Sequence, residues 1–199
     1  MKTPVVIGIT GGIGSGKSTL SGLFCTEGYL VYNTDKEARR LQNENPIIKQ
    51  KIQAIFGDVY TSEGLNRSAL AKIVFANPDS LTQLSNIVHP VVREDLKCWI
   101  LANSSQKLLF VESAILFENG LNKLVDKVIV ITASEDVRIK RVIKRDKVTE
   151  NQVRDRMANQ ISEESKIAKA DFVIHSDDDK PLVDKMRKIV KRLSVITEK

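Results

Sequence analysis

The stretch from Gly8 to Thr19 holds the residues best suited to chemistry. It reads GITGGIGSGKST, and it fits the phosphate-loop pattern G-x-x-x-x-G-K-[ST] between Gly11 and Ser18. Glycines let consecutive backbone amides turn inward, and the start of a following helix adds unpaired N–H groups, so the loop can form an anion nest. We expect Lys17 to reach the β- and γ-phosphates of a nucleotide and the Ser18 hydroxyl to bind Mg²⁺. The predicted phosphate site comprises Gly11, Gly12, Ile13, Gly14, Ser15, Gly16, Lys17, Ser18 and Thr19.

The composition is typical of a soluble globular protein, with 42% hydrophobic and 28% charged residues in a chain of 199. The two cysteines form no disulfide framework, and no apolar stretch approaches the length of a membrane span. The first expected strand begins within a few residues of Met1. We therefore expect a cytoplasmic protein with no membrane partner. Nothing in the sequence predicts its oligomeric state.

The net charge of +6 suggests an anionic partner, either nucleic acid or a small polyanion. Aromatic residues make up only 5% of the chain and are not interleaved with the basic ones, which disfavours single-strand nucleic-acid binding. The arginines near the phosphate loop account better for this charge. We therefore predict small-molecule substrates and no nucleic-acid partner.

Five segments have the composition of β-strands, and helical patterns separate them. They are residues 4–10, 30–33, 107–113, 127–132 and 171–175. Four of them carry apolar runs instead of alternation, which indicates parallel strands covered on both faces. The predicted class is α/β, with a five-stranded parallel sheet flanked by helices in a P-loop kinase fold.

Two helical insertions interrupt this pattern. The larger contains helical segments at residues 37–43, 46–56, 68–75 and 78–102. We predict a nucleotide-binding core of residues 1–35, 105–134 and 169–199, an acceptor-binding insertion at 36–104 and a lid at 135–168. A kinase of small molecules is built in this way, with one insertion holding the acceptor and the other closing over the phosphates.

Five sequence motifs together resemble dephospho-CoA kinase. They are TGGIGSGKST, YNTDKEARR from Tyr32, VHP at residues 88–90, ESAILFE at 112–118 and KRVIKRD at 140–146. The resemblance implies transfer of the γ-phosphoryl group of ATP, with Mg²⁺, to the 3′-hydroxyl of dephospho-CoA, the last step in making coenzyme A. The sequence departs from the family pattern at Asn33, where an acidic residue is common, and at residues 176–179, where Ser-Asp-Asp-Asp replaces an Asn-Gly or Asn-Ser pattern.

Asp35 follows the second expected strand, and ligands of parallel sheets lie beyond the carboxyl ends of the strands. A carboxylate there can accept the proton of an attacking hydroxyl. The alternative is a helix start, because Thr34 and Glu37 fit a capping box with Thr34 as the cap. The two readings are about evenly matched on the residues alone, and the resemblance favours catalysis.

Two carboxylates follow the third expected strand. Glu112 ends that strand and is a predicted Mg²⁺ ligand together with Ser18, directly or through water. Glu118 lies further along the loop, where it orders the loop or binds the acceptor.

A basic cluster lies in the expected lid. At 100° per residue, Arg138, Arg141 and Arg145 share one helical face. Arginine suits bidentate phosphate contacts, so we predict Arg141 and Arg145 as catalytic phosphate clamps alongside Lys17 and Asp35. Arg156 and Gln160 are weaker candidates. The alternative is an ordinary amphipathic helix with a solvated basic side.

His89 and Pro90 lie in the larger insertion, where no Ser or Cys partner motif accompanies the histidine. Pro90 interrupts the helical pattern, so the pair is expected to form a bend facing the acceptor. We place His89 and Arg93 among the acceptor-binding residues. The main alternative function is another P-loop small-molecule kinase, with a nucleotide or a sugar acid as acceptor. A non-catalytic nucleic-acid-binding module is a third possibility.

Overall fold

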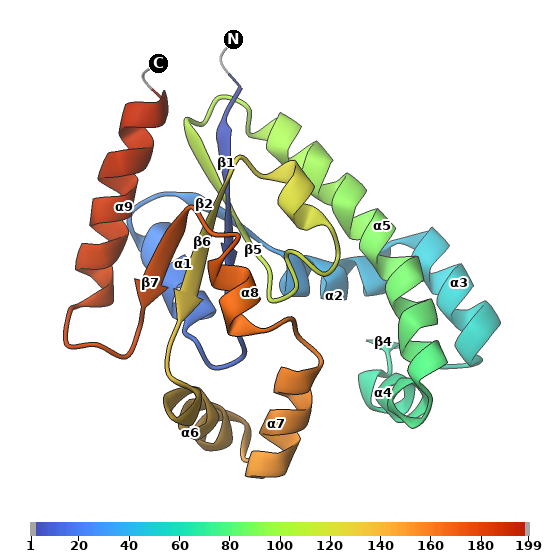
Figure 1. Ribbon diagram of the computed structural model, residues 1–199. Coiled ribbons are helices and arrows are strands. Elements are labelled where there is room, and N and C mark those ends of the chain that lie inside the picture. The colour runs from blue at the N-terminus through green and yellow to red at the C-terminus, as the bar shows by residue number, and fades with distance from the viewer. Residues whose placement is uncertain (1–2, 198–199) are drawn as a thin grey trace. The chain divides into compact units, whose positions relative to one another are not determined.

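The computed structural model describes residues 3–197, with the backbone alone at residues 75, 78, 196 and 197. Contacts divide the chain into two compact units. The first joins Met1–Tyr32 to Ala102–Lys199, and the second is Asn33–Leu101. Figure 1 traces the elements of both. The predicted insertion at 36–104 and lid at 135–168 stay predictions as functional domains.

The first unit contains a five-stranded sheet in the order β2-β5-β1-β6-β7. Its strands are β1 (Val5–Thr10), β2 (Leu30–Asn33), β5 (Leu108–Glu112), β6 (Lys127–Thr132) and β7 (Phe172–His175). Strand β1 pairs in parallel with both β5 and β6, and β6 pairs in parallel with β7. The predicted α/β sheet is therefore confirmed, with strand ends within one residue of those expected from the sequence.

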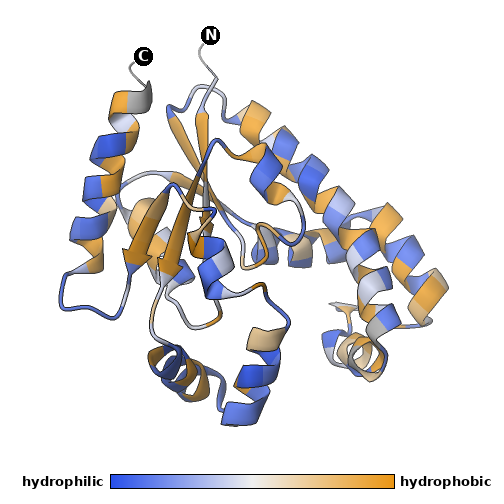
Figure 2. Cartoon of the chain, viewed as in Figure 1, coloured by the Kyte–Doolittle hydropathy of each residue, from blue (hydrophilic) through white to orange (hydrophobic). Residues whose placement is uncertain are grey.

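One face of the sheet forms the main core against two helices, α1 (Lys17–Thr26) and α9 (Leu182–Thr197). Ile7 and Ile9 of β1 contribute to this face, and Phe24 of α1 stacks on Phe110 of β5 with ring centroids 3.9 Å apart. Figure 2 shows the strands as hydrophobic throughout. On the opposite face, a Cβ at Gly8 would lie 2.8 Å from Leu116 Cδ2, so that face is packed too. Burial on both faces explains the apolar runs in the sequence.

The remaining helices of this unit follow β5 and β6. They are η1 (Leu121–Leu124), α6 (Glu135–Asp146), α7 (Glu150–Ala158) and α8 (Glu163–Ile167). Ile139 and Val142 of α6 pack against Val153 of α7, which gives this pair a small core of its own. Figure 1 shows α6 and α7 beyond the carboxyl ends of β6 and β7, where ligands of parallel sheets bind.

The second unit is mostly helical. Its elements are α2 (Thr34–Glu44), α3 (Pro46–Phe56), α4 (Arg67–Ala76), α5 (Pro78–Ala102) and a hairpin of β3 (Tyr60–Thr61) and β4 (Gly64–Leu65). The four predicted helices are present, and the hairpin was not predicted. Helix α5 continues through Pro90, so the expected interruption of this helix is wrong. Proline removes one backbone donor, while the turns on both sides keep the helix. Among the described residues, no helix is long and apolar enough to span a membrane.

Candidate active site

The phosphate loop joins β1 to α1 and passes close to two neighbouring segments. At Gly11, a Cβ would lie 2.0 Å from the carbonyl oxygen of Ile131 on β6. Gly14 has φ 80°, and a Cβ there would lie 2.5 Å from the carbonyl oxygen of Arg138 on α6. Neither position can hold a side chain without moving backbone, so the glycines allow the loop to lie against β6 and α6.

Lys17 turns back over the loop. Its Nζ donates hydrogen bonds to the carbonyl oxygens of Gly11 at 2.8 Å and Gly12 at 3.0 Å. Helix α1 begins at Lys17, after Gly16 in a left-handed conformation. The N–H groups of a first helical turn have no partner within the helix, and the helix dipole adds positive potential there. The lysine and the helix start thus surround a place suited to phosphate.

Ser18 and Glu112 form a hydroxyl–carboxylate pair beside this loop. Ser18 Oγ donates to Glu112 Oε1 at 3.0 Å, and Glu112 is 7% exposed at the end of β5. Oxygen ligands of this kind suit Mg²⁺, which keeps several waters and takes few protein ligands. The described residues contain no cluster of three or more His, Cys, Asp or Glu side chains suited to a metal. The Ser18–Glu112 pair therefore fits a Mg²⁺ whose other ligands are water and nucleotide oxygens.

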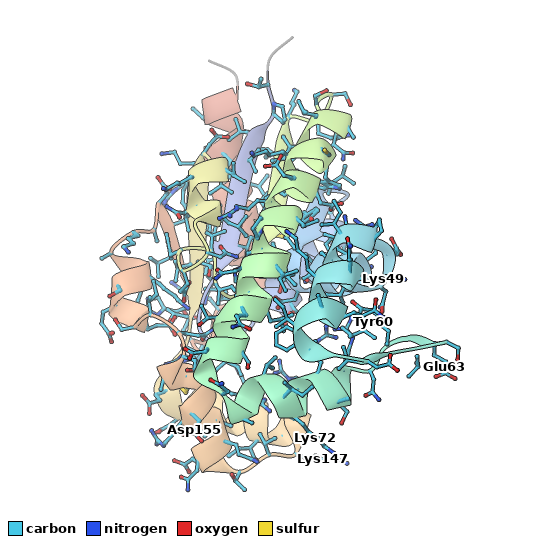
Figure 3. All side chains as sticks on the ribbon, turned by 90° about the vertical axis from the view of Figure 1, so that its right-hand side faces the viewer. Lys49, Tyr60, Glu63, Lys72, Lys147 and Asp155 are labelled. Carbon is cyan, nitrogen blue, oxygen red and sulfur yellow. The ribbon has the colours of Figure 1, made fainter. Side chains whose placement is uncertain are left out.

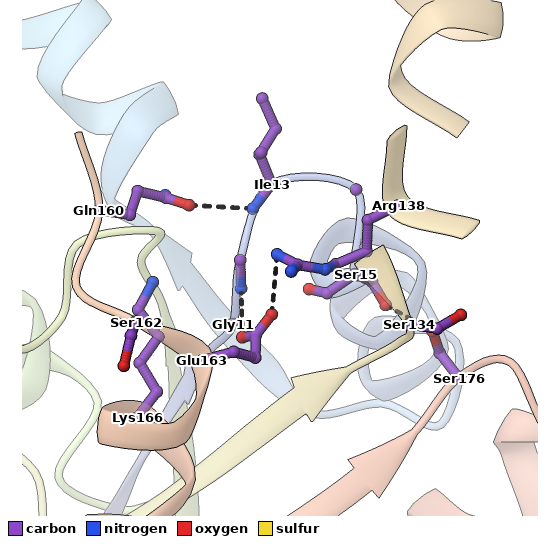
Figure 4. A network of polar contacts seen from close by, with 12 residues as sticks. Gly11, Ile13, Ser15, Ser134, Arg138, Gln160, Ser162, Glu163, Lys166 and Ser176 are labelled. Carbon is purple, nitrogen blue, oxygen red and sulfur yellow. Dashed lines mark hydrogen bonds and ion pairs between the residues drawn. The ribbon is translucent and has the colours of Figure 1, made fainter. Parts of the chain in front are cut away.

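The segment between α7 and α8 is bonded to the phosphate loop, as Figure 4 shows. Glu163 Oε1 accepts from the Gly12 amide at 3.0 Å, and Gln160 Oε1 accepts from the Ile13 amide at 3.0 Å. Glu163 Oε2 also lies 2.9 Å from Arg138 Nη1, and both side chains of this ion pair are about nine-tenths buried, at 12% and 10% exposed. These contacts fix the first half of the loop and use Arg138 as an internal ion-pair partner.

Arg141 contacts the other half of the loop. Its Nη1 donates to Ser176 Oγ at 2.7 Å and to the Gly14 carbonyl oxygen at 3.4 Å, and its Nη2 donates to the Ser176 carbonyl oxygen at 2.8 Å. Ser176 Oγ in turn donates to the Ser15 carbonyl oxygen at 2.7 Å. The serine in the departing 176–179 segment therefore links Arg141 to the phosphate loop. This position suits the predicted role of Arg141 as a phosphate clamp.

Arg145 points to a different partner. It donates to Asp146 at 2.7 Å, which raises the pKa of the arginine, and Arg156 also contacts Asp146 at 2.8 Å. Arg145 remains largely exposed. Its predicted clamp role stays a prediction, since this structure places it in an ion pair at the end of α6.

A buried lysine holds the loop after β5. The Lys166 side chain is fully buried on α8, with Nζ 3.4 Å from the Ala114 carbonyl oxygen and 3.7 Å from Glu118 Oε1. Burial lowers the pKa of Lys166, while the charges of Glu118 and Glu163 oppose that shift. Glu118 also accepts from the Ile161 amide at 3.2 Å. These contacts favour the loop-ordering role of Glu118, and acceptor binding by Glu118 stays a prediction.

The predicted base lies in the second unit, in the first turn of α2. The helix cap is Asn33, whose side chain accepts from the Lys36 amide at 2.9 Å, so the capping box with Thr34 as the cap is wrong. Asparagine ranks with aspartate as a cap, which explains the residue at this departure from the family pattern. Since Asn33 performs the capping, Asp35 is left for another role.

His89 and Arg93 lie one turn apart on α5 in the second unit. Burial, with the nearby Arg93 charge, lowers the pKa of His89. The imidazole is therefore neutral at pH 7, where it can both donate and accept a hydrogen bond. The structure thus gathers the nucleotide-site candidates in the first unit and Asp35, His89 and Arg93 in the second.

The fold and the loop geometry define a P-loop kinase of small molecules. A family model described as dephospho-CoA kinase matches residues 5–181. Two relatives carry that name. The one from Bacteroides fragilis is 34% identical over 94% of this chain and 91% of its own, and the one from Porphyromonas gingivalis is 40% identical over 83% and 82%. The dephospho-CoA kinase structure from Campylobacter jejuni is 30% identical, covers 97% of both chains and has a TM-score of 0.68. The chain belongs to the dephospho-CoA kinase family.

Sequence reasoning missed the contacts made by Glu163, Lys166 and Ser176. Each joins residues far apart in the chain, such as Gly12 and Glu163, and no local pattern marks such a pair. Gln160 was a weak candidate, and its bond to the Ile13 amide now gives it a place. For Arg138 the available signal was the basic helical face, which does not distinguish a buried ion pair from a solvated side chain.

Proposed function

We propose that this protein transfers the γ-phosphoryl group of ATP to the 3′-hydroxyl of dephospho-CoA, giving coenzyme A and ADP. The observation that carries the proposal is the phosphate loop with Lys17, the Ser18–Glu112 pair and Arg141 around it, in a chain of this family. The loop amides and Lys17 hold the phosphates of ATP. Arg141 stabilises the charge that spreads over the transferred group.

Asp35 orients the 3′-hydroxyl and accepts its proton. The bond from the γ-phosphorus to the β,γ-bridging oxygen breaks, the bond to the 3′-oxygen forms, and ADP leaves. Mg²⁺ held by Ser18 and Glu112, in part through water, neutralises the phosphate oxygens when it is bound. Neutral His89 and Arg93 contact the acceptor from α5.

An ADP-release assay across acceptors tests the proposal. The panel is dephospho-CoA, adenosine, AMP, shikimate and no acceptor, each with and without excess EDTA. We expect turnover with dephospho-CoA that EDTA abolishes, and little with the other acceptors. Turnover with AMP or shikimate and none with dephospho-CoA would instead support a kinase with another acceptor.

A further inference from the structure

Two arginines of the second unit lie side by side without an acidic partner. Arg67 is exposed at the start of α4, where Nη1 donates to Gln42 Oε1 at 3.0 Å and Nη2 donates to the backbone carbonyl oxygen of Arg39 at 3.1 Å. Arg39 is also exposed, on α2. Within the part of the chain that the structure describes, neither guanidinium forms an ion pair.

The next residue along α2 behaves differently. Arg40 pairs with Glu37 at 2.5 Å, Glu44 at 2.9 Å and Asp95 at 2.8 Å. The same helix therefore carries one arginine whose charge is fully matched and one whose charge is not. The unmatched charge at Arg39 does not come from a lack of acids nearby, because three carboxylates are taken by its neighbour.

Electrostatics show that gathering these cations is unfavourable in the protein alone. Burial, together with the neighbouring Arg39 charge, lowers the pKa of Arg67. Arg67 is also the first residue of α4, and a helix dipole disfavours a cation at that end. An anion bound between the two side chains would remove both penalties.

The surroundings hold this arrangement in place. Tyr60, labelled in Figure 3, donates from its hydroxyl to the Gln42 carbonyl oxygen at 2.8 Å. Asn43 Oδ1 accepts from the Leu65 amide at 2.9 Å. The β3–β4 hairpin is thus bonded to α2 beside the residues that Arg67 contacts, so the two arginines sit on a braced support.

The arginine pair also lies close to the proposed base. Asp35 and Arg39 are four residues apart on α2, so they share one face of the helix about 6 Å apart along its axis. Arg40 points about 140° away from Asp35 around the same helix. In dephospho-CoA, the diphosphate is attached at C5′ of the same ribose whose 3′-hydroxyl is phosphorylated. A ribose held at Asp35 therefore places its diphosphate within reach of the next turn.

We propose that Arg39 and Arg67 bind the diphosphate of the acceptor and so select acceptors that carry one. The inference rests on the proposed function, because Asp35 must hold the ribose 3′-hydroxyl. The two guanidinium groups offer planar forks suited to phosphate oxygens. They help to position the acceptor and take no part in the transfer itself.

Binding and kinetics of Arg39→Gln and Arg67→Gln test this, with Arg40→Gln as the matched control. Calorimetry measures the affinity for dephospho-CoA in full-length protein saturated with Mg²⁺ and a non-hydrolysable ATP analogue. Each test variant should bind dephospho-CoA roughly ten- to a hundredfold more weakly, as expected for loss of a charge-assisted contact. The KM for ATP should stay within about twofold of wild type. The Arg40→Gln variant should melt lower with unchanged affinity. Arg67→Lys should recover part of the loss.

Salt adds a readout that a purely structural role would not change. Raising potassium chloride should weaken dephospho-CoA binding to wild type more than to the Arg39→Gln/Arg67→Gln double variant, since screening acts on the missing charges. Affinities of both test variants equal to that of Arg40→Gln, with normal turnover, would overturn the inference alone. A wild-type protein that binds no dephospho-CoA and phosphorylates another acceptor would overturn the proposed function and this inference with it.

Discussion

Replacing Glu163 tests whether the segment before α8 supports the phosphate loop. Glu163 accepts from the Gly12 amide at 3.0 Å and pairs with Arg138 at 2.9 Å. Glu163→Ala removes both partners at once and leaves Arg138 as a buried cation without its carboxylate. Glu163→Gln keeps the size and an oxygen for the Gly12 amide and removes only the charge.

The magnitude follows from burial. Breaking a buried ion pair typically costs 3–5 kcal/mol, and the side chains here are 10% and 12% exposed, so about 3 kcal/mol is expected for Glu163→Ala. In a protein of this size that lowers the melting temperature by about 6–12 °C. Glu163→Gln should cost about 1–2 kcal/mol, because it keeps the amide bond. The double variant with Arg138→Gln should cost less than the sum of its single changes, since no charge is then left unpaired.

Activity should change through the nucleotide. Gly12 lies in the phosphate loop, so we expect the KM for ATP to rise roughly tenfold in Glu163→Ala and the KM for dephospho-CoA to change little. Steady-state kinetics and urea unfolding on the same preparations measure both effects. Glu164→Gln is the matched control, because its exposed carboxylate is next in the same helix. Glu163→Ala with the stability and ATP KM of Glu164→Gln would refute the reasoning.

Three further variants test individual roles. Lys17→Ala should abolish transfer while the far-UV circular dichroism stays unchanged, because the ammonium contacts only loop carbonyl oxygens among the hydrogen bonds above; a lost folded signal would indicate a structural role. Asp35→Asn should lower kcat at least about a hundredfold at a nearly unchanged melting temperature, since Asn33 caps the helix, and retained kcat would remove Asp35 from the catalytic residues. Because the pKa of His89 is lowered in the folded protein, wild type should lose stability relative to His89→Gln as pH falls below about 6.5, with no such divergence above it; parallel urea-unfolding curves from pH 7.5 to 5 would contradict this.

The sheet could be predicted because its information is local. Apolar runs such as residues 127–132 mark buried parallel strands, and the glycine spacing from Gly11 to Gly16 marks the loop. The contact between Ser18 and Glu112 follows from the same reasoning, since β1 and β5 are neighbours and both end at one edge of the sheet. The β3–β4 hairpin escaped prediction because its strands have two residues each and no alternation to detect.

The helix cap and the buried charges could not be read in the same way. Thr34 and Asn33 are both good caps, and the choice depends on where the strand before them ends. Lys166 has the sequence appearance of a surface lysine on a short helix, yet it is fully buried. Its burial depends on the loop after β5, whose Ala114 carbonyl oxygen and Glu118 carboxylate lie more than forty residues earlier in the chain.

These anchors narrow what a lid could be in this protein. Near its start, α6 is bonded to the phosphate loop through Arg138 and Arg141, by way of Glu163 and Ser176. Near the end of the predicted lid, Gln160 bonds the same loop. Between these anchors, α7 packs on α6 through Val153. Any closing motion of residues 135–168 must therefore pull on the phosphate loop or bend the turn between α6 and α7. In either case the lid is coupled to the loop that holds ATP, so nucleotide binding and lid position should respond together.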